Sequence, residues 1–149
     1  MKTFEEAIMS SLSGDTQKNA LDFAAFLKEN DMATGENHST ILFRGDVLAY
    51  MYMDGKAEMP GPWTIWPSAS GDVPDGFIFD EAMKQVAHAH VNICGDCGSG
   101  CAPGSRKSVY GKESDNVCGA VLAFTDPSED ALACVKKILE MIKFELDNR

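Results

Sequence analysis

Apolar residues recur every three to four positions at the start of the chain, which is the period of helices that bury one face. The first stripe follows a capping-box pair, Thr3 and Glu6, and predicts a short helix that Ser13-Gly14 stops. A second stripe predicts a helix from Asp15 or Thr16 to about Asn30. Both helices are expected to pack on a core through these positions: Phe4, Ile8 and Leu12 in the first, and Ala20, Phe23, Ala24 and Leu27 in the second.

After a loop predicted at residues 33–37, the pattern changes to the β-branched and aromatic runs typical of strands. Residues 39–43 and 47–53 flank Arg44-Gly45-Asp46, which indicates a tight hairpin. The second strand carries large side chains on both faces, so it is expected to be central and covered on both sides. Prolines confine the next strand to residues 63–66 and favour a sheet edge.

The C-terminal half returns to helices. Asp80 is expected to cap a helix that runs directly into Cys94. Residues 117–124 predict a strand, and Asp126-Pro127-Ser128-Glu129 then opens the last helix, with Asp126 at the N-cap. Because strands joined by short turns are antiparallel, the pattern predicts an α+β fold. We expect one domain over residues 1–149, with a mostly antiparallel sheet of about four strands and helices packed on it.

Composition narrows the function classes. Acidic residues outnumber basic ones 23 to 13, and the resulting net charge of −10 argues against a nucleic-acid partner. No stretch is long and apolar enough to span a bilayer, so no membrane association is expected. The N-terminus lacks a basic region followed by an apolar run, which favours the cytoplasm, where thiols stay reduced.

The chemistry lies in the cysteines, four of which fall within a glycine-rich loop predicted at residues 94–118. Cys94 and Cys97 have the spacing of a zinc knuckle, whereas three residues separate Cys97 from Cys101 and sixteen separate Cys101 from Cys118. Long structureless loops are uncommon inside compact domains. We therefore expect Cys94, Cys97, Cys101 and Cys118 to bind a structural metal, most simply zinc.

Several alternatives remain open. An iron–sulfur cluster is less favoured because the spacing is not that of ferredoxins, and reduced thiols or an adventitious disulfide would leave the loop without a metal. Arg106, Lys107 and Lys112 lie in the predicted loop and are expected to offset the charge of four thiolates. A thioredoxin-like motif begins a helix, whereas this one would end a helix, which counts against an oxidoreductase.

Three other features are weaker candidates for a functional role. His90, four residues before Cys94, is the best substitute metal ligand, although a core-facing histidine is the simpler interpretation. Cys134 is expected to be a small buried side chain. A cluster of bulky residues is expected mainly in the core, with a small-molecule pocket as the alternative; it comprises Tyr50, Met51, Tyr52, Met53, Met59, Trp63 and Trp66.

Two stretches resemble a small, uncharacterised bacterial protein family with no assigned activity. They are Met59-Pro60-Gly61-Pro62-Trp63-Thr64-Ile65-Trp66, and His90-Val91-Asn92 with Cys94, Cys97, Cys101, Gly111-Lys112 and Cys118. The resemblance extends from about Leu21 onward and implies a bacterial cytoplasmic domain without naming catalytic residues.

Together these observations predict a binding or regulatory module with a structural zinc site, whose partner is a small molecule or a protein. The alternative is a thiol-dependent redox enzyme or sensor that uses the same cysteines. The sequence indicates no particular reaction.

Overall fold

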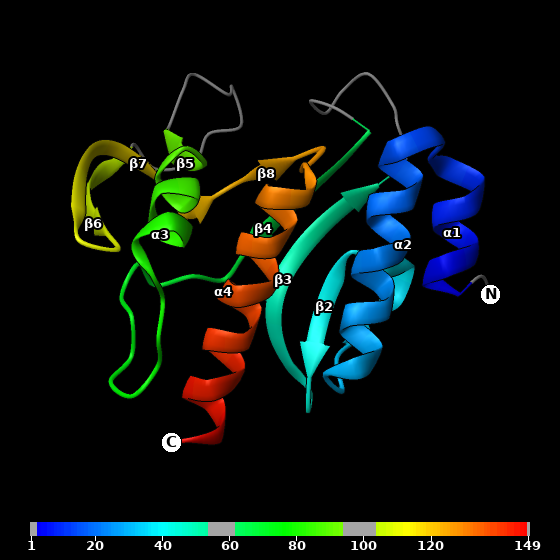
Figure 1. Cartoon of the computed structure of the whole chain (residues 1–149), viewed down its shortest axis with the longest axis horizontal. Coiled ribbons are helices and arrows are strands. Elements are labelled where there is room, and N and C mark those ends of the chain that lie inside the picture. Colours follow the sequence, from blue (N-terminus) through cyan, green and yellow to red (C-terminus); the bar gives the residue numbers. More distant parts are fainter. Residues whose placement is uncertain (1–2, 54–61, 94–103, 149) are drawn as a thin grey trace.

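The computed structural model of the chain describes residues 3–53, 62–93 and 104–148. These ranges contain four α-helices and two antiparallel sheets, which confirms the α+β class (Figure 1). The strands are divided between a five-stranded and a three-stranded sheet, instead of forming one sheet of about four strands. In chain order the elements are α1 (Phe4–Ser11), α2 (Gly14–Glu29), β1 (Ala33–Thr34), the 3-10 helix η1 (Glu36–His38), β2 (Thr40–Phe43), β3 (Asp46–Met53), β4 (Trp63–Pro67), α3 (Glu81–His88), β5 (Val91–Ile93), β6 (Ser105–Val109), β7 (Lys112–Leu122), β8 (Phe124–Thr125) and α4 (Glu129–Asp147).

The helices begin where side chains satisfy their first backbone N–H groups. Thr3 accepts a hydrogen bond from the backbone N–H of Glu6, as the capping-box pattern predicts. The predicted N-cap of the last helix was wrong by two residues, because Ser128 caps α4 by accepting from the N–H of Ala131. Asp126 instead adopts a φ of 43° and accepts a hydrogen bond from the Thr16 hydroxyl at 2.9 Å.

The five-stranded sheet has the order β1-β2-β3-β4-β8. Its central hairpin turns at Arg44 and Gly45, whose φ angles of 53° and 85° are those of a type I′ turn. The strand β3 is central, as predicted, but only one of its faces is well covered. The side chain of Met51 is buried on that face, whereas Tyr50 on the other face is 54% exposed.

Two smaller predictions about this sheet were wrong. The strand β4 is not at the edge, because Thr64 and Ile65 also pair with the two-residue strand β8. The segment 33–37, predicted as a loop, contains β1 and the start of η1, since Ala33 and Thr34 pair with β2. Both differences arise from two-residue strands, which are too short to leave a periodic pattern.

The three-stranded sheet has the order β5-β7-β6, with β7 in the middle. Most of its β6–β7 hairpin lies within the predicted cysteine loop, and its turn at Tyr110 and Gly111 has φ angles of 48° and 86°. The strand predicted at 117–124 starts earlier, at Lys112, and is interrupted at Ala123. A single stretch of chain therefore runs from the smaller sheet into the larger one.

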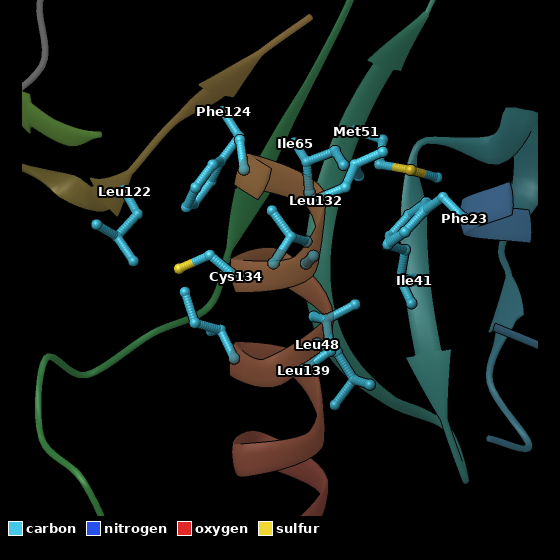
Figure 2. Close-up of a cluster of buried hydrophobic side chains, with 14 of the residues drawn as sticks. Phe23, Ile41, Leu48, Met51, Ile65, Leu122, Phe124, Leu132, Cys134 and Leu139 are labelled. Carbon is cyan, nitrogen blue, oxygen red and sulfur yellow. The ribbon is translucent and has the colours of Figure 1, made fainter. Parts of the chain in front are cut away.

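Helices α2 and α4 cover one face of the five-stranded sheet, and α1 packs beside α2 (Figure 1). Leu132, Cys134 and Leu139 project from α4 into the core, with Cys134 directed toward Leu122 at the end of β7 (Figure 2). Buried residues of both sheets belong to one hydrophobic cluster. In the ranges given above, none of the helices combines the length and apolar character that a membrane span requires.

Candidate metal centre

The candidate centre is built around the middle strand of the smaller sheet. Ile93, the last residue of β5, pairs with Val117 of β7 from one side, and Ser105, the first residue of β6, pairs with the same Val117 from the other. Since neighbouring strands lie about 4.8 Å apart, Ile93 and Ser105 stand about 10 Å apart across β7. The segment that carries three cysteines therefore leaves and rejoins the sheet on either side of one residue.

Cys118 is the next residue after Val117. The side chain of Val117 is 1% exposed, whereas that of Cys118 is partly accessible. Lys107 of β6 donates a hydrogen bond from Nζ to the carbonyl oxygen of Cys118 at 3.4 Å. This contact links the backbone of β7 at Cys118 to the side chain of a residue on β6. The register thus places the backbone of Cys118 next to the residue that pairs with both Ile93 and Ser105.

The ladder is irregular on both sides of Cys118. Opposite β6, the register shifts near Asn116, whose φ is 59°, and opposite β5 it shifts between Val117 and Leu122. The side-chain amide of Asn92 donates to the Ala120 carbonyl at 3.0 Å and bridges the second irregularity. Irregularities of this kind re-aim side chains and are over-represented beside functional sites.

A glycine is required where the segment rejoins the sheet. A Cβ atom added to Gly104 would lie 2.6 Å from the backbone carbonyl group of Asn116, closer than real contacts allow. Gly104 therefore lets the two backbones approach each other at the bulge in β7. This observation gives one glycine of the cysteine-rich region a packing role.

The predicted metal ligands fall into two groups. Cys94, Cys97 and Cys101 lie outside the described residues, and Cys118 lies on β7. Within the described ranges, no group of three or more histidine, cysteine or acidic side chains is close enough to hold a metal ion. The four-cysteine site thus stays a prediction, to which the structure adds the position of Cys118 relative to the two ends of segment 94–103.

The environment of His90 supports its interpretation as a structural residue. The helix expected to reach Cys94 ends at His88, so that prediction was wrong, and β5 follows it. The Nδ1 atom of His90 donates to the Val86 carbonyl at 2.9 Å, and its ring stacks on Phe124 with centroids 4.4 Å apart. Because His90 precedes Ile93 by three residues, about 10 Å of strand separates it from the Cys118 end of the sheet.

The end of α3 also removes the dipole argument against a redox motif. Cys94 follows a strand in the sequence, so no helix C-terminus precedes it directly. The alternation in Val91-Asn92-Ile93 was the signal for this strand, but three residues are too few to be recognised alone.

The expected charge compensation is only partly available. Arg106 forms ion pairs with Glu113 at 2.6 Å and Asp115 at 2.9 Å, and the hydrogen bond with Glu113 is the main reason that the pKa of Arg106 is raised. Lys112 lies at the turn end of the hairpin, paired with Val109. Of the three basic residues, Lys107 is therefore the one that contacts Cys118.

The fifth cysteine has the predicted structural role. Cys134 is completely buried, and its Sγ donates to the Met83 carbonyl at 3.5 Å. Burial raises the pKa of the Cys134 thiol to about 12, so the thiol is protonated and unreactive at neutral pH.

The cluster of bulky residues from Tyr50 to Trp66 is divided in the structure, and its described members Met51, Tyr52 and Met53 line a cavity with Ala7 and residues 37–39. Met51 and Trp63 are buried in the core, whereas Tyr50 and Trp66 form a cross-strand pair on the opposite face of the sheet. Met59 lies outside the described residues. The sequence grouping therefore separates into a core set and a surface set.

Comparisons of the chain with protein-family models, with curated proteins and with solved structures give no match.

Proposed function

We propose that the chain is a binding or regulatory module in which Cys94, Cys97, Cys101 and Cys118 hold a structural zinc ion. The observation that supports this proposal is the pairing of Ile93 and Ser105 with Val117, directly beside Cys118. In a tetrahedral thiolate site the sulfur atoms lie about 3.7 Å apart, so all four cysteines must converge on one point. Cys94 is bonded to Ile93, and four residues of chain span at most about 14 Å, which brings Cys101 within reach from Ser105.

A bound metal would add to the stability of the smaller sheet near Cys118. Between Ser105 and Asn116 the β6–β7 hairpin buries two side chains, those of Val109 and Tyr110 at its turn, whereas Arg106, Glu113 and Asp115 lie on its surface. A metal bound only by the folded chain would add its binding free energy to the stability of these strands. Lys107 at the Cys118 carbonyl would offset part of the charge of the thiolates.

The proposal includes a reducing compartment, for which we take the cytoplasm, because oxidation would consume the ligands. With a net charge of −10, we take the partner to be a protein or a small molecule and not a nucleic acid.

Metal analysis tests the proposal directly. Untagged protein purified without oxygen should contain one zinc per chain by mass spectrometry, and Cys118→Ser should lower the zinc content severalfold. Cys134→Ala is the matched control, because it removes a buried thiol from α4 and should retain the metal. Chelation should also accelerate amide hydrogen exchange in β5, β6 and β7 more than in α1 and α2.

Other results of these experiments would contradict the zinc site or point to another chemistry. A well-folded protein without metal, or full zinc in Cys118→Ser, would contradict the zinc site. Iron with sulfide would identify a cluster. Absence of metal together with fast-reacting thiols of lowered pKa would favour a thiol-dependent enzyme or sensor.

A further inference from the structure

Helix α1 is joined to α2 by a short connection with the features of a hinge. Leu12 and Ser13 have extended backbone conformations, and Gly14 follows with a φ of 60°. A Cβ atom added to Gly14 would meet nothing within 4 Å, so the backbone conformation, and not close packing, favours glycine there. Ser13 stands at the N-cap of α2 without a side-chain hydrogen bond. The direction in which α1 leaves α2 therefore depends on the φ of one glycine.

The attachment of α1 to the rest of the chain is limited to one face. Phe4, Ile8 and Leu12 are buried on this face, whereas Met9 is 58% exposed. Glu5 adds an ion pair with Lys28 of α2 at 3.1 Å, but this pair lies at the surface, where such contacts contribute little. Because a helix of eight residues is not stable alone, α1 depends on these contacts for its structure.

Two cavities border α1. One of about 270 Å³ lies between Phe4, Leu27 of α2 and Met32, which precedes β1. Another, of about 350 Å³, lies between Ala7 of α1, residues 37–39 and the end of β3. Side chains that face a void lose the dispersion contacts that a filled interior would provide. The cavities therefore weaken the hold of the molecule on α1.

The surface that α1 covers is complementary to α1 of a second copy. That helix would bring the same apolar side chains to the same partners, and the same Glu5 to Lys28, so the exchange preserves the native contacts of α1. Short hinge loops of this kind favour such exchanges. We propose that α1 turns about Ser13 and Gly14 and exchanges between two copies of this chain, which forms a domain-swapped dimer.

The charge of the chain makes this exchange sensitive to salt. Each copy has a net charge of −10, so two copies repel each other at low ionic strength. Added salt screens this repulsion, whereas the buried face of α1 is apolar and little affected by screening. The swapped dimer should therefore increase with salt as well as with protein concentration, in contrast to a dimer held by ion pairs.

Gly14→Ala tests the hinge. Alanine is disfavoured at a φ of 60° and favours helix more than glycine does, so both effects disfavour the closed connection and favour one that continues α2. The dimerisation constant should rise at least about tenfold. Size-exclusion chromatography with light scattering measures it, in the presence of a reductant so that disulfide-linked dimers are not counted.

Gly45→Ala is the matched control. Gly45 also has a positive φ, 85°, and a Cβ atom there would meet nothing within 4 Å, but it lies in the β2–β3 hairpin. This change should lower the stability of the chain and leave its dimerisation constant unaltered. The control thus separates the opening of the hinge from general destabilisation.

A carbodiimide cross-link then shows which copy supplies α1. Glu5 and Lys28 are close enough for this reagent to join them directly. When unlabelled and isotope-labelled chains are mixed, Glu5–Lys28 peptide pairs that combine both isotopic forms should appear in the dimer fraction and not in the monomer fraction. The unaltered protein at high concentration and salt should give the same mixed pairs in smaller amount.

The proposal is independent of the metal site, and three results would overturn it. The first is a Gly14→Ala chain that dimerises no more than the unaltered protein, and the second is an equal gain in Gly45→Ala. The third is a dimer, of the variant or of the unaltered protein, whose Glu5–Lys28 pairs all come from one isotopic form.

Discussion

The two sheets are stabilised in different ways. The larger one buries big apolar side chains from three strands against α2 and α4, among them Ile41, Leu48 and Ile65, none of which is exposed (Figure 2). In the smaller sheet, β7 exposes most of its first five residues and is buried mainly from Val117 onward. The comparison indicates that apolar burial is enough to stabilise the first region, whereas the β6–β7 hairpin, which buries Val109 and Tyr110 before Val117, depends more on strand pairing and, in our proposal, on a metal.

The largest expected effect comes from opening the core of the larger sheet. Leu139→Ala should lower the free energy of unfolding by about 2–5 kcal/mol, because it leaves a cavity at a fully buried position on α4. Urea denaturation followed by circular dichroism measures the change. Met9→Ala, at a side chain that is 58% exposed, is the control and should change stability by less than about 0.5 kcal/mol.

Val117→Ala is the corresponding core substitution in the smaller sheet. Removal of two buried carbon atoms should cost about 1.6 kcal/mol. Hydrogen exchange should then accelerate mainly in β5, β6 and β7, whereas Leu139→Ala should accelerate it throughout the chain. Uniform acceleration in both variants would show that the two regions unfold as one unit.

The junction between the regions should be sensitive to alkaline pH. The pKa of the Cys134 thiol is raised to about 12 in the folded protein, above its value in the unfolded chain. Folding therefore disfavours the thiolate, and the stability from the neutral thiol is present below about pH 9 and lost as the pH rises toward 12. The cost approaches about 1.4 kcal/mol per pH unit within that window.

Cys134→Ala should give a shallower decline of stability between pH 9 and 11, measured by urea denaturation at each pH. An equally steep decline in the variant would assign the alkaline sensitivity elsewhere. Tyr110 is a second contributor, because burial also raises the pKa of its phenol.

The smallest expected effect concerns the start of α4, where Asp126 was the predicted cap and Ser128 is the observed one. Ser128→Ala should cost about 1 kcal/mol, because the N–H of Ala131 loses its acceptor. Asp126→Asn should cost less, since asparagine tolerates the positive φ at this position and the residue does not cap the helix. Thermal denaturation measures both variants, and equal melting temperatures of Ser128→Ala and the unaltered protein would contradict the role of Ser128 as the cap.

The elements that the sequence predicted well are those with redundant local signals. In α2 the stripe Ala20, Phe23, Ala24 and Leu27 is buried as expected, and Arg44-Gly45 turns the hairpin as its composition indicates. The β6–β7 hairpin was missed because Arg106, Lys107, Glu113 and Asp115 give it no alternation of apolar residues. Its strands are held by pairing across the turn at Tyr110 and Gly111, which a hydrophobic pattern does not reveal.

The candidate site was predictable in its residues but not in its arrangement. Cysteine spacing alone indicated the set Cys94, Cys97, Cys101 and Cys118. The proximity of Cys118 to both ends of the segment depends on the register of β7 against two other strands, which is a tertiary property.

The pairing of β4 with β8 has a consequence for biosynthesis. Ile65 pairs with Phe124, so the far edge of β4 is completed only after nearly sixty further residues have been synthesised. At about 5–20 residues per second, the ribosome leaves that edge open for several seconds. During this interval the nascent chain presents Trp63–Pro67 as an unpaired edge, and slowing translation after residue 67 should increase its recruitment of chaperones.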